Sequence, residues 1–273
     1  AADRNTTGSA LWHDGEGKLF HLNGLEAAGG WANLALVLRT STDNGATWAA
    51  PRLINPHHQP RNQVISGTSR TKEGFVLQAC DAVNGGNGGT ALHVSRDGGL
   101  TWTDPGAGTP KPNFQLDAPG GTIAGIHAGV VQLADGSLLA FGRGDSRLGS
   151  NDNIGQRMPQ SVSTDMGKTW RYRASPWPPI GGNQRLVLLR LREGPLLFIS
   201  YTHDFFKHRL NPDAAPPFTV TDAAGQPRRI YGMFAALSPD EGKTWPVRKP
   251  VVPDGPPLEL KGVTLTGTVR LDA

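Results

Sequence analysis

The sequence is poor in sulfur and in tyrosine: its 273 residues include one cysteine, three methionines and three tyrosines. The single cysteine, Cys80, excludes an internal disulfide framework. We expect it to be a small buried hydrophobe at the end of a strand. No apolar run approaches the ~20 residues that cross a bilayer as a helix. We therefore expect a soluble chain without a membrane span.

Charge is also sparse, with 18% of residues charged and a formal net charge of +4. The sequence pI is about 9.4, yet the arginines are scattered through loops and form no dense basic run. This distribution disfavours nucleic acid as a partner and favours a small anionic substrate.

Glycine and proline, in contrast, are abundant, with 36 and 22 residues. No segment has a convincing amphipathic helical pattern. Short apolar runs are instead bounded by turn residues, as in AGVVQL, ADGS and LLAFGRG. This composition favours many short strands joined by turns.

Four octamers share the pattern Ser-x-Asp-x-Gly-x-Thr-Trp. They are STDNGATW from Ser41, SRDGGLTW from Ser95, STDMGKTW from Ser163 and SPDEGKTW from Ser238. Each follows the same order of features: an apolar run, a tight turn, a second run, a variable loop, and a third run leading into the octamer. Four-stranded units repeated radially describe a β-propeller.

The octamer itself is interpreted as a structural turn between strands three and four. The Asp side chain can accept hydrogen bonds from backbone N–H groups just ahead of it. The Gly can adopt a positive φ, and the Trp offers a large apolar surface for packing between sheets. No nucleophile or ligand set recurs within the octamers.

The octamer resembles the Asp box, or BNR repeat, of the sialidase superfamily, and the resemblance covers essentially the whole chain. It implies an all-β, six-bladed propeller, of which about four blades are expected here. We expect one propeller domain over residues 1–273, as a fragment of that propeller. The approximate blades are 8–56, 61–112, 123–178 and 184–252, with the start of a further blade at 259–273. The resemblance also implies a secreted or periplasmic protein, although this chain shows no leader.

The two ends of such a propeller differ. Turns between strands one and two and between strands three and four lie at one end, so the octamers share that end. The longer loops share the opposite end, where we expect the site. Strand two closes with a carboxylate in every unit, namely Glu26, Asp81, Asp145 and Asp204.

Arginine, histidine and tyrosine side chains accompany these carboxylates. His127 and Arg185 stand just ahead of strand one, which lines the axis, so we expect both to point toward the central pocket. The others are Arg143, Arg147, Arg157, Tyr201, His203, Arg228, Arg229 and Tyr231. Such a set suits an anionic, hydroxyl-rich ligand, because Arg binds carboxylates bidentately and paired carboxyl groups serve glycoside hydrolysis.

Each of these residues also has a structural interpretation. A lone carboxylate at a strand end is more often a turn cap or an ion-pair partner. Arg143 and Asp145 could pair with each other, His127 could be a core histidine, and Tyr231 could be ordinary aromatic packing. The segment SNDNIG lacks the spacing of a calcium loop, so we expect a solvated loop there and no metal.

One segment extends the resemblance into the site. Sialidases often show a Glu, then a hairpin, then an Arg, and HAGVVQLADGSLLAFGR runs from His127 to Arg143 at the same separation. By this resemblance Arg143 matches one arginine of the triad that binds the sialic acid carboxylate. His127 stands where the family has the Glu that assists a tyrosine nucleophile. The family's Phe/Tyr-Arg-Ile-Pro motif is absent.

The favoured function is that of a sialidase-like glycoside hydrolase, an exo-alpha-sialidase, acting on a terminal acidic sugar of a glycan. The catalytic candidates are His127, Asp145, Asp204 and Tyr231, and the substrate-binding candidates are Arg143, Arg157, Arg185, His203 and Tyr201. That chemistry requires no metal or organic cofactor. A polysaccharide lyase, with His or Tyr removing the proton beside a uronate carboxylate, and a non-catalytic glycan-binding propeller are the alternatives. The sequence leaves the oligomeric state open.

Overall fold

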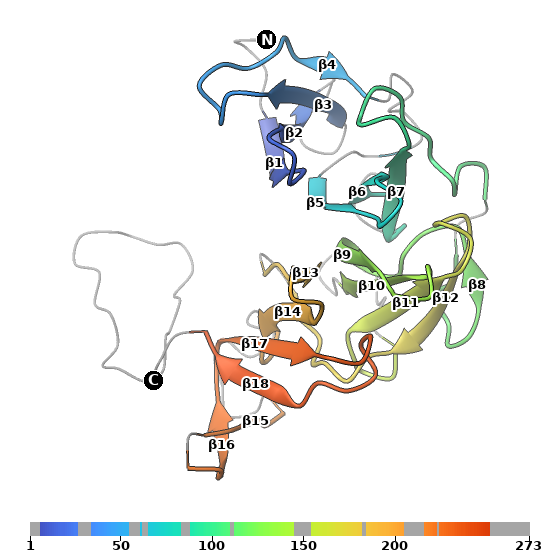
Figure 1. The fold of residues 1–273 in the computed structure, drawn as a ribbon. Helices are drawn as coiled ribbons and strands as arrows, with labels where there is room; N and C mark the ends of the chain where they lie inside the picture. The colour runs from blue at the N-terminus through green and yellow to red at the C-terminus, as the bar shows by residue number, and fades with distance from the viewer. Residues whose placement is uncertain are drawn as a thin grey trace.

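The chain forms successive antiparallel sheets that follow one another around an arc (Figure 1). The computed structural model describes residues 6–26, 34–54, 61, 65–82, 88–109, 112–144, 154–181, 184–204, 216–222 and 224–251. Every regular element among these residues is a β-strand, and no helix in this part of the chain could span a membrane. The prediction of an all-β fold is confirmed.

The first two sheets contain the strands up to Ser95. The first sheet has the order β1-β2-β3-β4 and the second the order β5-β6-β7. Their strands are β1 (Thr6–His13), β2 (Leu19–Glu26), β3 (Leu34–Ser41), β4 (Arg52–Leu53), β5 (Ile65–Arg70), β6 (Val76–Asp81) and β7 (Thr90–Ser95). Thr103 pairs with Val94 at the outer edge of the second sheet, in the position of a fourth strand.

The third sheet has five strands in the order β8-β12-β11-β10-β9. They are β8 (Pro119–Gly120), β9 (Ile126–Gln132), β10 (Leu138–Arg143), β11 (Pro159–Ser163) and β12 (Trp170–Ala174). The two-residue strand β8 joins the outer edge of the sheet ahead of the four expected strands. A strand that short has no period for the sequence to reveal.

The fourth sheet has the order β13-β14-β17-β18, with β13 (Val187–Arg190), β14 (Leu196–Tyr201), β17 (Met233–Ser238) and β18 (Val247–Pro250). Between β14 and β17 the sequence predicted only the variable loop of the repeating unit. The structure has a hairpin there, β15 (Phe218–Thr221) paired with β16 (Pro227–Ile230). Phe218, Val220 and Ile230 are buried in the core of the fourth sheet, and this burial stabilises the insertion.

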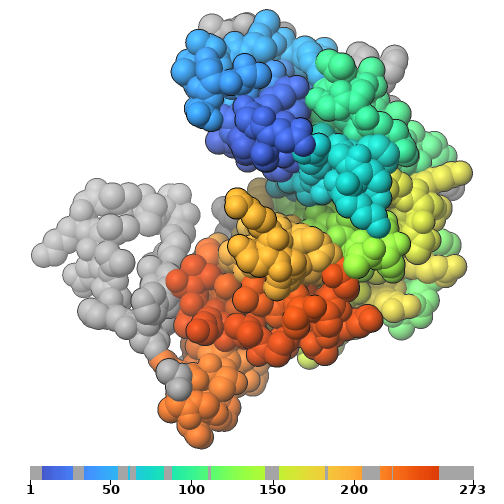
Figure 2. All heavy atoms as spheres, in the orientation of Figure 1, coloured from blue at the N-terminus to red at the C-terminus, as the bar shows by residue number. Residues whose placement is uncertain are grey.

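The first strands of successive sheets contact one another in chain order: β1 with β5, β5 with β9, and β9 with β13. Later strands of each sheet lie progressively farther out (Figure 1). In the space-filling view, the first sheet in blue and the fourth sheet in orange and red lie at the two ends of this arc (Figure 2). This radial arrangement is that of four β-propeller blades.

Apolar side chains fill the interfaces between neighbouring sheets. Leu77 and Leu92 of the second sheet share a cluster with Val130, Leu138 and Trp170 of the third. Between the third and fourth sheets, the ring of Trp177 stacks on Phe198 at 4.9 Å between centroids and lies 5.2 Å from Trp245. Burial of side chains this large contributes roughly 1.5–3 kcal/mol each, so these interfaces hold the blades together.

The four octamers form the same hydrogen-bonded turn. In the third, Ser163 Oγ donates to Asp165 Oδ1 at 2.8 Å and accepts from the N–H of Gly167 at 2.9 Å. Asp165 also accepts from the backbone N–H and hydroxyl of Thr169 at 2.9 and 2.6 Å, and Trp170 Nε1 donates to the carbonyl of Gly167 at 3.1 Å. Matching bonds recur in the other three boxes. The predicted role of the octamer as a turn is therefore confirmed.

Each box after the first also contacts the sheet before it. A Cβ added to Gly99 would meet Phe20 at 2.9 Å, one on Gly167 would meet Leu92 at 2.7 Å, and one on Gly242 would meet Leu139 at 2.9 Å. The box turns also touch the turns between strands one and two, because Glu241 Oε2 accepts from the N–H of Ala134 at 2.7 Å. The boxes and these turns share one end of the molecule, as expected.

Candidate functional site

His127 lies in a strained stretch at the start of β9. Its φ is +54°, in the left-handed region that is uncommon for residues with a side chain. The strand pairing is irregular here, because the register between β9 and β10 shifts between Phe141 and Arg143. β9 begins at Ile126, so His127 lies inside the strand, where the sequence placed it just ahead of the strand. Such irregularities re-aim side chains and occur next to functional sites.

Two glycines permit this irregularity. A Cβ on Gly125 would lie 2.7 Å from the carbonyl carbon of Gly142, and a Cβ on Gly142 would lie 2.1 Å from the carbonyl oxygen of Ala124. Gly125 itself has a φ of +79°. The backbones of β9 and β10 therefore approach more closely than any side chain would allow.

The imidazole of His127 contacts a carboxylate from the neighbouring sheet. Its Nε2 lies 3.3 Å from Oδ2 of Asp81, the last residue of β6, and the side chains are 7% and 1% exposed. Among the described residues, no hydrogen-bond partner is found for His127 Nδ1 or for Asp81 Oδ1. Buried polar atoms are usually satisfied, so each of these two atoms keeps the capacity for one more hydrogen bond, at a position that solvent does not reach in this structure.

The contact defines the chemistry of the ring. A carboxylate oxygen accepts, so Nε2 carries the proton and Nδ1 keeps its lone pair. Burial lowers the pKa of His127, the contact with Asp81 opposes that effect, and the positive charges of Arg185 and Arg143 lower the pKa further. At neutral pH the ring is therefore a neutral base oriented by a carboxylate, the arrangement used in general base catalysis.

Arg143 and Arg185 are anchored on one carbonyl group. Arg143 Nη1 donates to the main-chain oxygen of Gln184 at 2.9 Å, and Arg185 Nη1 donates to the same oxygen at 3.1 Å. Arg143, at the end of β10, is 4% exposed, whereas Arg185 is exposed. Both charges act on His127, so the structure brings these three predicted residues together.

Gln184 also connects this group to the end of β14. Its side-chain nitrogen donates to the carbonyl of His203 at 3.0 Å, and its side-chain oxygen accepts from the N–H of Gly181 at 3.1 Å. The carboxylate of Asp204 lies against Gly181, where an added Cβ would be 2.4 Å from Oδ2. Asp204 is 9% exposed and lies at the same end of the molecule as His127.

The aromatic ring of Tyr231 lies beside His203. The rings of His203 and Tyr231 meet edge to face at 6.2 Å, and the guanidinium of Arg229 lies 4.6 Å from the centre of the Tyr231 ring. His203 Nδ1 also contacts the hydroxyl of Thr202 at 3.0 Å. Predicted residues of the fourth sheet therefore cluster among themselves.

The remaining predicted residues are placed differently. Tyr201 packs against the apolar core of the fourth sheet. Arg157 is exposed, in a turn where its backbone pairs with Ile154. Asp145 and Arg147 lie outside the described residues, as does the segment around SNDNIG up to residue 153. Glu26 ends β2 in the first sheet.

Asp81 is not among the predicted catalytic residues, although its position at the end of strand two gives it the same signal in the sequence as Asp204. The decisive partner, His127, belongs to the next sheet. Among the residues that the structure describes, no group of three His, Cys, Asp or Glu side chains could hold a metal ion.

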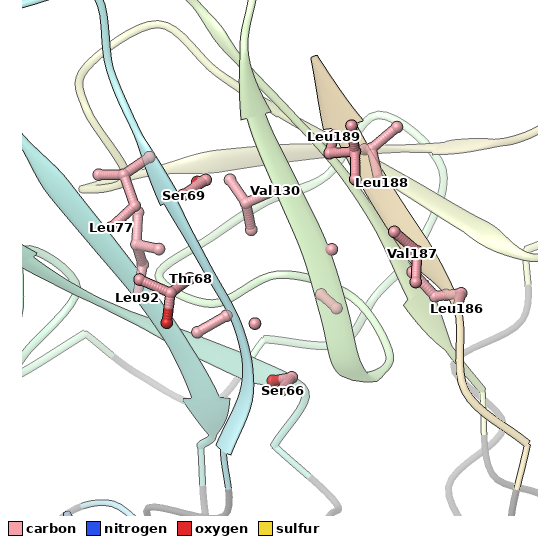
Figure 3. Close-up of a pocket in the computed structure, with 14 residues that line it drawn as sticks. Ser66, Thr68, Ser69, Leu77, Leu92, Val130, Leu186, Val187, Leu188 and Leu189 are labelled. Carbon is pink, nitrogen blue, oxygen red and sulfur yellow. The ribbon is translucent and has the colours of Figure 1, made fainter. Parts of the chain in front are cut away.

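A cavity of about 140 Å³ lies along the inner strands, lined by Ser66, Thr68 and Ser69 of β5 and otherwise mostly by apolar side chains. Its labelled side chains come from β5, β6, β7, β9 and residues 186–189 (Figure 3). Its lining includes Ala128 and Leu186, the neighbours of His127 and Arg185 in the chain.

The sequence profile of the BNR repeat-like domain matches residues 3–256. The chain belongs to the BNR repeat-like domain family. No curated protein is similar enough to count as a match.

The fold of this chain resembles those of solved glycosidases. A Hadza microbial sialidase superposes with a TM-score of 0.56 at 16% identity, covering 90% of this chain and 45% of that one. Trypanosoma rangeli sialidase bound to 2,3-difluorosialic acid gives 0.53 at 15% identity, covering 88% and 44%. An alpha-L-arabinofuranosidase from Clostridium thermocellum gives 0.50 at 15%, covering 89% and 72%. The chain spans less than half the length of these two sialidases. At such identities the likeness shows a shared fold.

Proposed function

We propose that the protein is a glycoside hydrolase that acts on a terminal acidic sugar of a glycan, with sialic acid as the first substrate to test. The observation that carries this proposal is the arrangement of two arginines on the carbonyl of Gln184 beside the His127–Asp81 pair. The fold shared with sialidases supports the choice of sugar.

Each residue has a distinct role in this proposal. Arg143 and Arg185 bind the carboxylate of the sugar, because guanidinium groups bind carboxylates in fixed geometry. His127 accepts a proton through Nδ1 from the attacking hydroxyl group or water, while Asp81 holds the ring. Asp204 donates a proton to the departing glycosidic oxygen as the bond to the anomeric carbon breaks.

A release assay tests the proposal. The complete protein is incubated with a fluorogenic sialoside, and free sialic acid is identified by mass spectrometry. Release that is lost in His127→Gln supports the proposal. A folded protein that releases no sialic acid from any common linkage contradicts it.

A polysaccharide lyase is the second candidate, favoured by the neutral His127 held by a carboxylate next to two cations. In that reaction Nδ1 removes the proton beside a uronate carboxylate, the arginines neutralise that carboxylate, and a carbon–carbon double bond forms as the glycosidic C–O bond breaks. An ultraviolet-absorbing unsaturated product from a uronate polysaccharide identifies this activity. Binding of glycans without either product indicates a non-catalytic propeller.

A further inference from the structure

Thr90 connects the second sheet to the irregular backbone that carries His127. This threonine, the first residue of β7, is fully buried. Its hydroxyl donates to the carbonyl of Gly125 at 2.8 Å and accepts from the N–H of Ala128 at 3.2 Å. One side chain thus satisfies the two backbone groups on either side of Ile126 and His127.

The same threonine is also next to Asp81. Thr90 and Asp81 are directly paired across β6 and β7, and paired residues project from the same face of a sheet. The main chain of Thr90 exchanges two further hydrogen bonds with Ile123, at 2.9 and 2.8 Å. Thr90 therefore fixes the position of the His127 backbone relative to the strand that supplies the carboxylate.

We propose that Thr90 is a positioning residue, whose hydroxyl holds His127 in its left-handed conformation against Asp81. The catalytic part of this inference rests on the proposed function, whereas the geometric part does not. Strained conformations persist only where the surroundings over-determine them, and Thr90 supplies a constraint from another sheet.

The buried hydroxyl of Thr122 offers a matched control. It spans the same pair of sheets by donating to the carbonyl of Gly88 at 2.7 Å, and Thr122 is 3% exposed. In the described part of the chain, this hydroxyl forms no hydrogen bond with residues 125–128. Loss of either hydroxyl removes a buried hydrogen bond, so both variants should lose similar stability.

The test compares Thr90→Val, Thr90→Ser and Thr122→Val in the complete protein. Thr90→Ala is included because it removes the hydroxyl without placing a methyl group against the carbonyl of Gly125. The titration of His127 is followed by NMR of histidine labelled at Cε1, with its signal assigned from His127→Gln. The charged groups that act on His127 are Asp81, Arg143 and Arg185, and none of the variants changes them.

We expect the midpoint of the His127 titration to rise in Thr90→Val and Thr90→Ala, because a relaxed backbone admits water to the buried ring. A weaker contact with Asp81 acts in the opposite direction, but burial is the largest single effect on the pKa of His127. Thr90→Ser and Thr122→Val should titrate like the unaltered protein. For whichever activity is found, kcat should fall about ten- to a hundredfold in Thr90→Val and Thr90→Ala, with little change in KM.

The two proposals fail separately. If the midpoint stays in place in both Thr90→Val and Thr90→Ala, or moves equally in Thr122→Val, the positioning role is overturned. If the midpoint moves only in the Thr90 variants lacking a hydroxyl while no glycan is cleaved, the positioning role stands and the proposed function fails.

Discussion

Nε2 of His127 lies 3.3 Å from Oδ2 of Asp81 across the interface between the second and third sheets. The pair exists because β6 ends, and β9 begins, at the same end of adjacent blades. Its function depends on the packing of two sheets as much as on either side chain.

Removing either member should disable the pair. Asp81→Asn and His127→Gln should each lower kcat by about 10²- to 10⁴-fold. The kcat of the double variant should be no lower than that of the less active single variant, because the two residues act as a unit. Steady-state kinetics on the substrate found measures this, with His21→Gln, a half-buried histidine of the first sheet, as control. Independent, multiplicative losses would contradict the pairing.

Arg143 should control affinity for the anionic group. Arg143→Ala is expected to raise KM for an acidic sugar by about ten- to a hundredfold, since a charged hydrogen bond contributes about 1.5–3 kcal/mol. The methyl ester of the same sugar should bind weakly to both proteins and show no difference. Arg171→Ala, at an exposed position of β12, is the control for lost charge. An equal effect on ester and acid would show that Arg143 does not bind the carboxylate.

Gly181 offers a way to move Asp204 without altering it. Gly181→Ala places a Cβ 2.4 Å from Oδ2 of Asp204, so the carboxylate must shift. We expect kcat to fall about as far as in Asp204→Asn, by roughly 10²-fold or more. In the Asp204→Asn background the alanine should cause little further loss. A Gly181→Ala enzyme with unchanged kcat would remove Asp204 from the proposed chemistry.

His93 should make the protein less stable in acid. Burial lowers the pKa of this fully buried histidine to about 4, while Asp104 raises it and Arg61 lowers it. The unfolded chain therefore binds the proton first as the pH falls below about 6.5. The contribution of the neutral His93 to the free energy of unfolding is fully present above that pH, and about 2 kcal/mol of it is lost by pH 5. Urea unfolding at pH 7 and pH 5 measures the loss, which should shrink in His93→Gln. An unchanged pH dependence in that variant would contradict this assignment.

Alanine substitutions at two glycines with similar φ angles distinguish the cost of backbone strain from the cost of steric crowding. Gly136 and Gly167 have φ values of +89° and +87°. A Cβ on Gly136 meets only Lys72 Nζ at 3.8 Å, whereas one on Gly167 meets Leu92 Cδ2 at 2.7 Å. Both alanine variants should lose about 1–2 kcal/mol from the positive φ, and Gly167→Ala about 1–3 kcal/mol more from overpacking. Equal losses in urea unfolding would show that the third box does not press on the second sheet.

The Asp boxes could be predicted because their chemistry is local. Ser163, Asp165, Gly167 and Trp170 satisfy one another within eight residues, so their order in the sequence carries all the information. The four-stranded units follow from the boxes for the same reason. The β15–β16 hairpin was missed because its strands have four residues each and stand in a long connection.

The Asp81–His127 contact could not be predicted from residue types. It depends on which residue of β6 faces the third sheet and on an irregular register near Gly142. Both are set by packing between segments far apart in the chain. The sequence did indicate that His127, Arg143 and Arg185 belong to one end of the molecule. Whether they serve catalysis stays a prediction.

The contacts of the Asp boxes also follow the order of the chain. The second, third and fourth boxes each contact the sheet made before them in the chain, through Gly99, Gly167 and Gly242. We therefore expect each newly translated sheet to pack on the sheet that precedes it in the chain. Assembly can proceed blade by blade in the order of translation, without any sheet waiting for a later one to define its place.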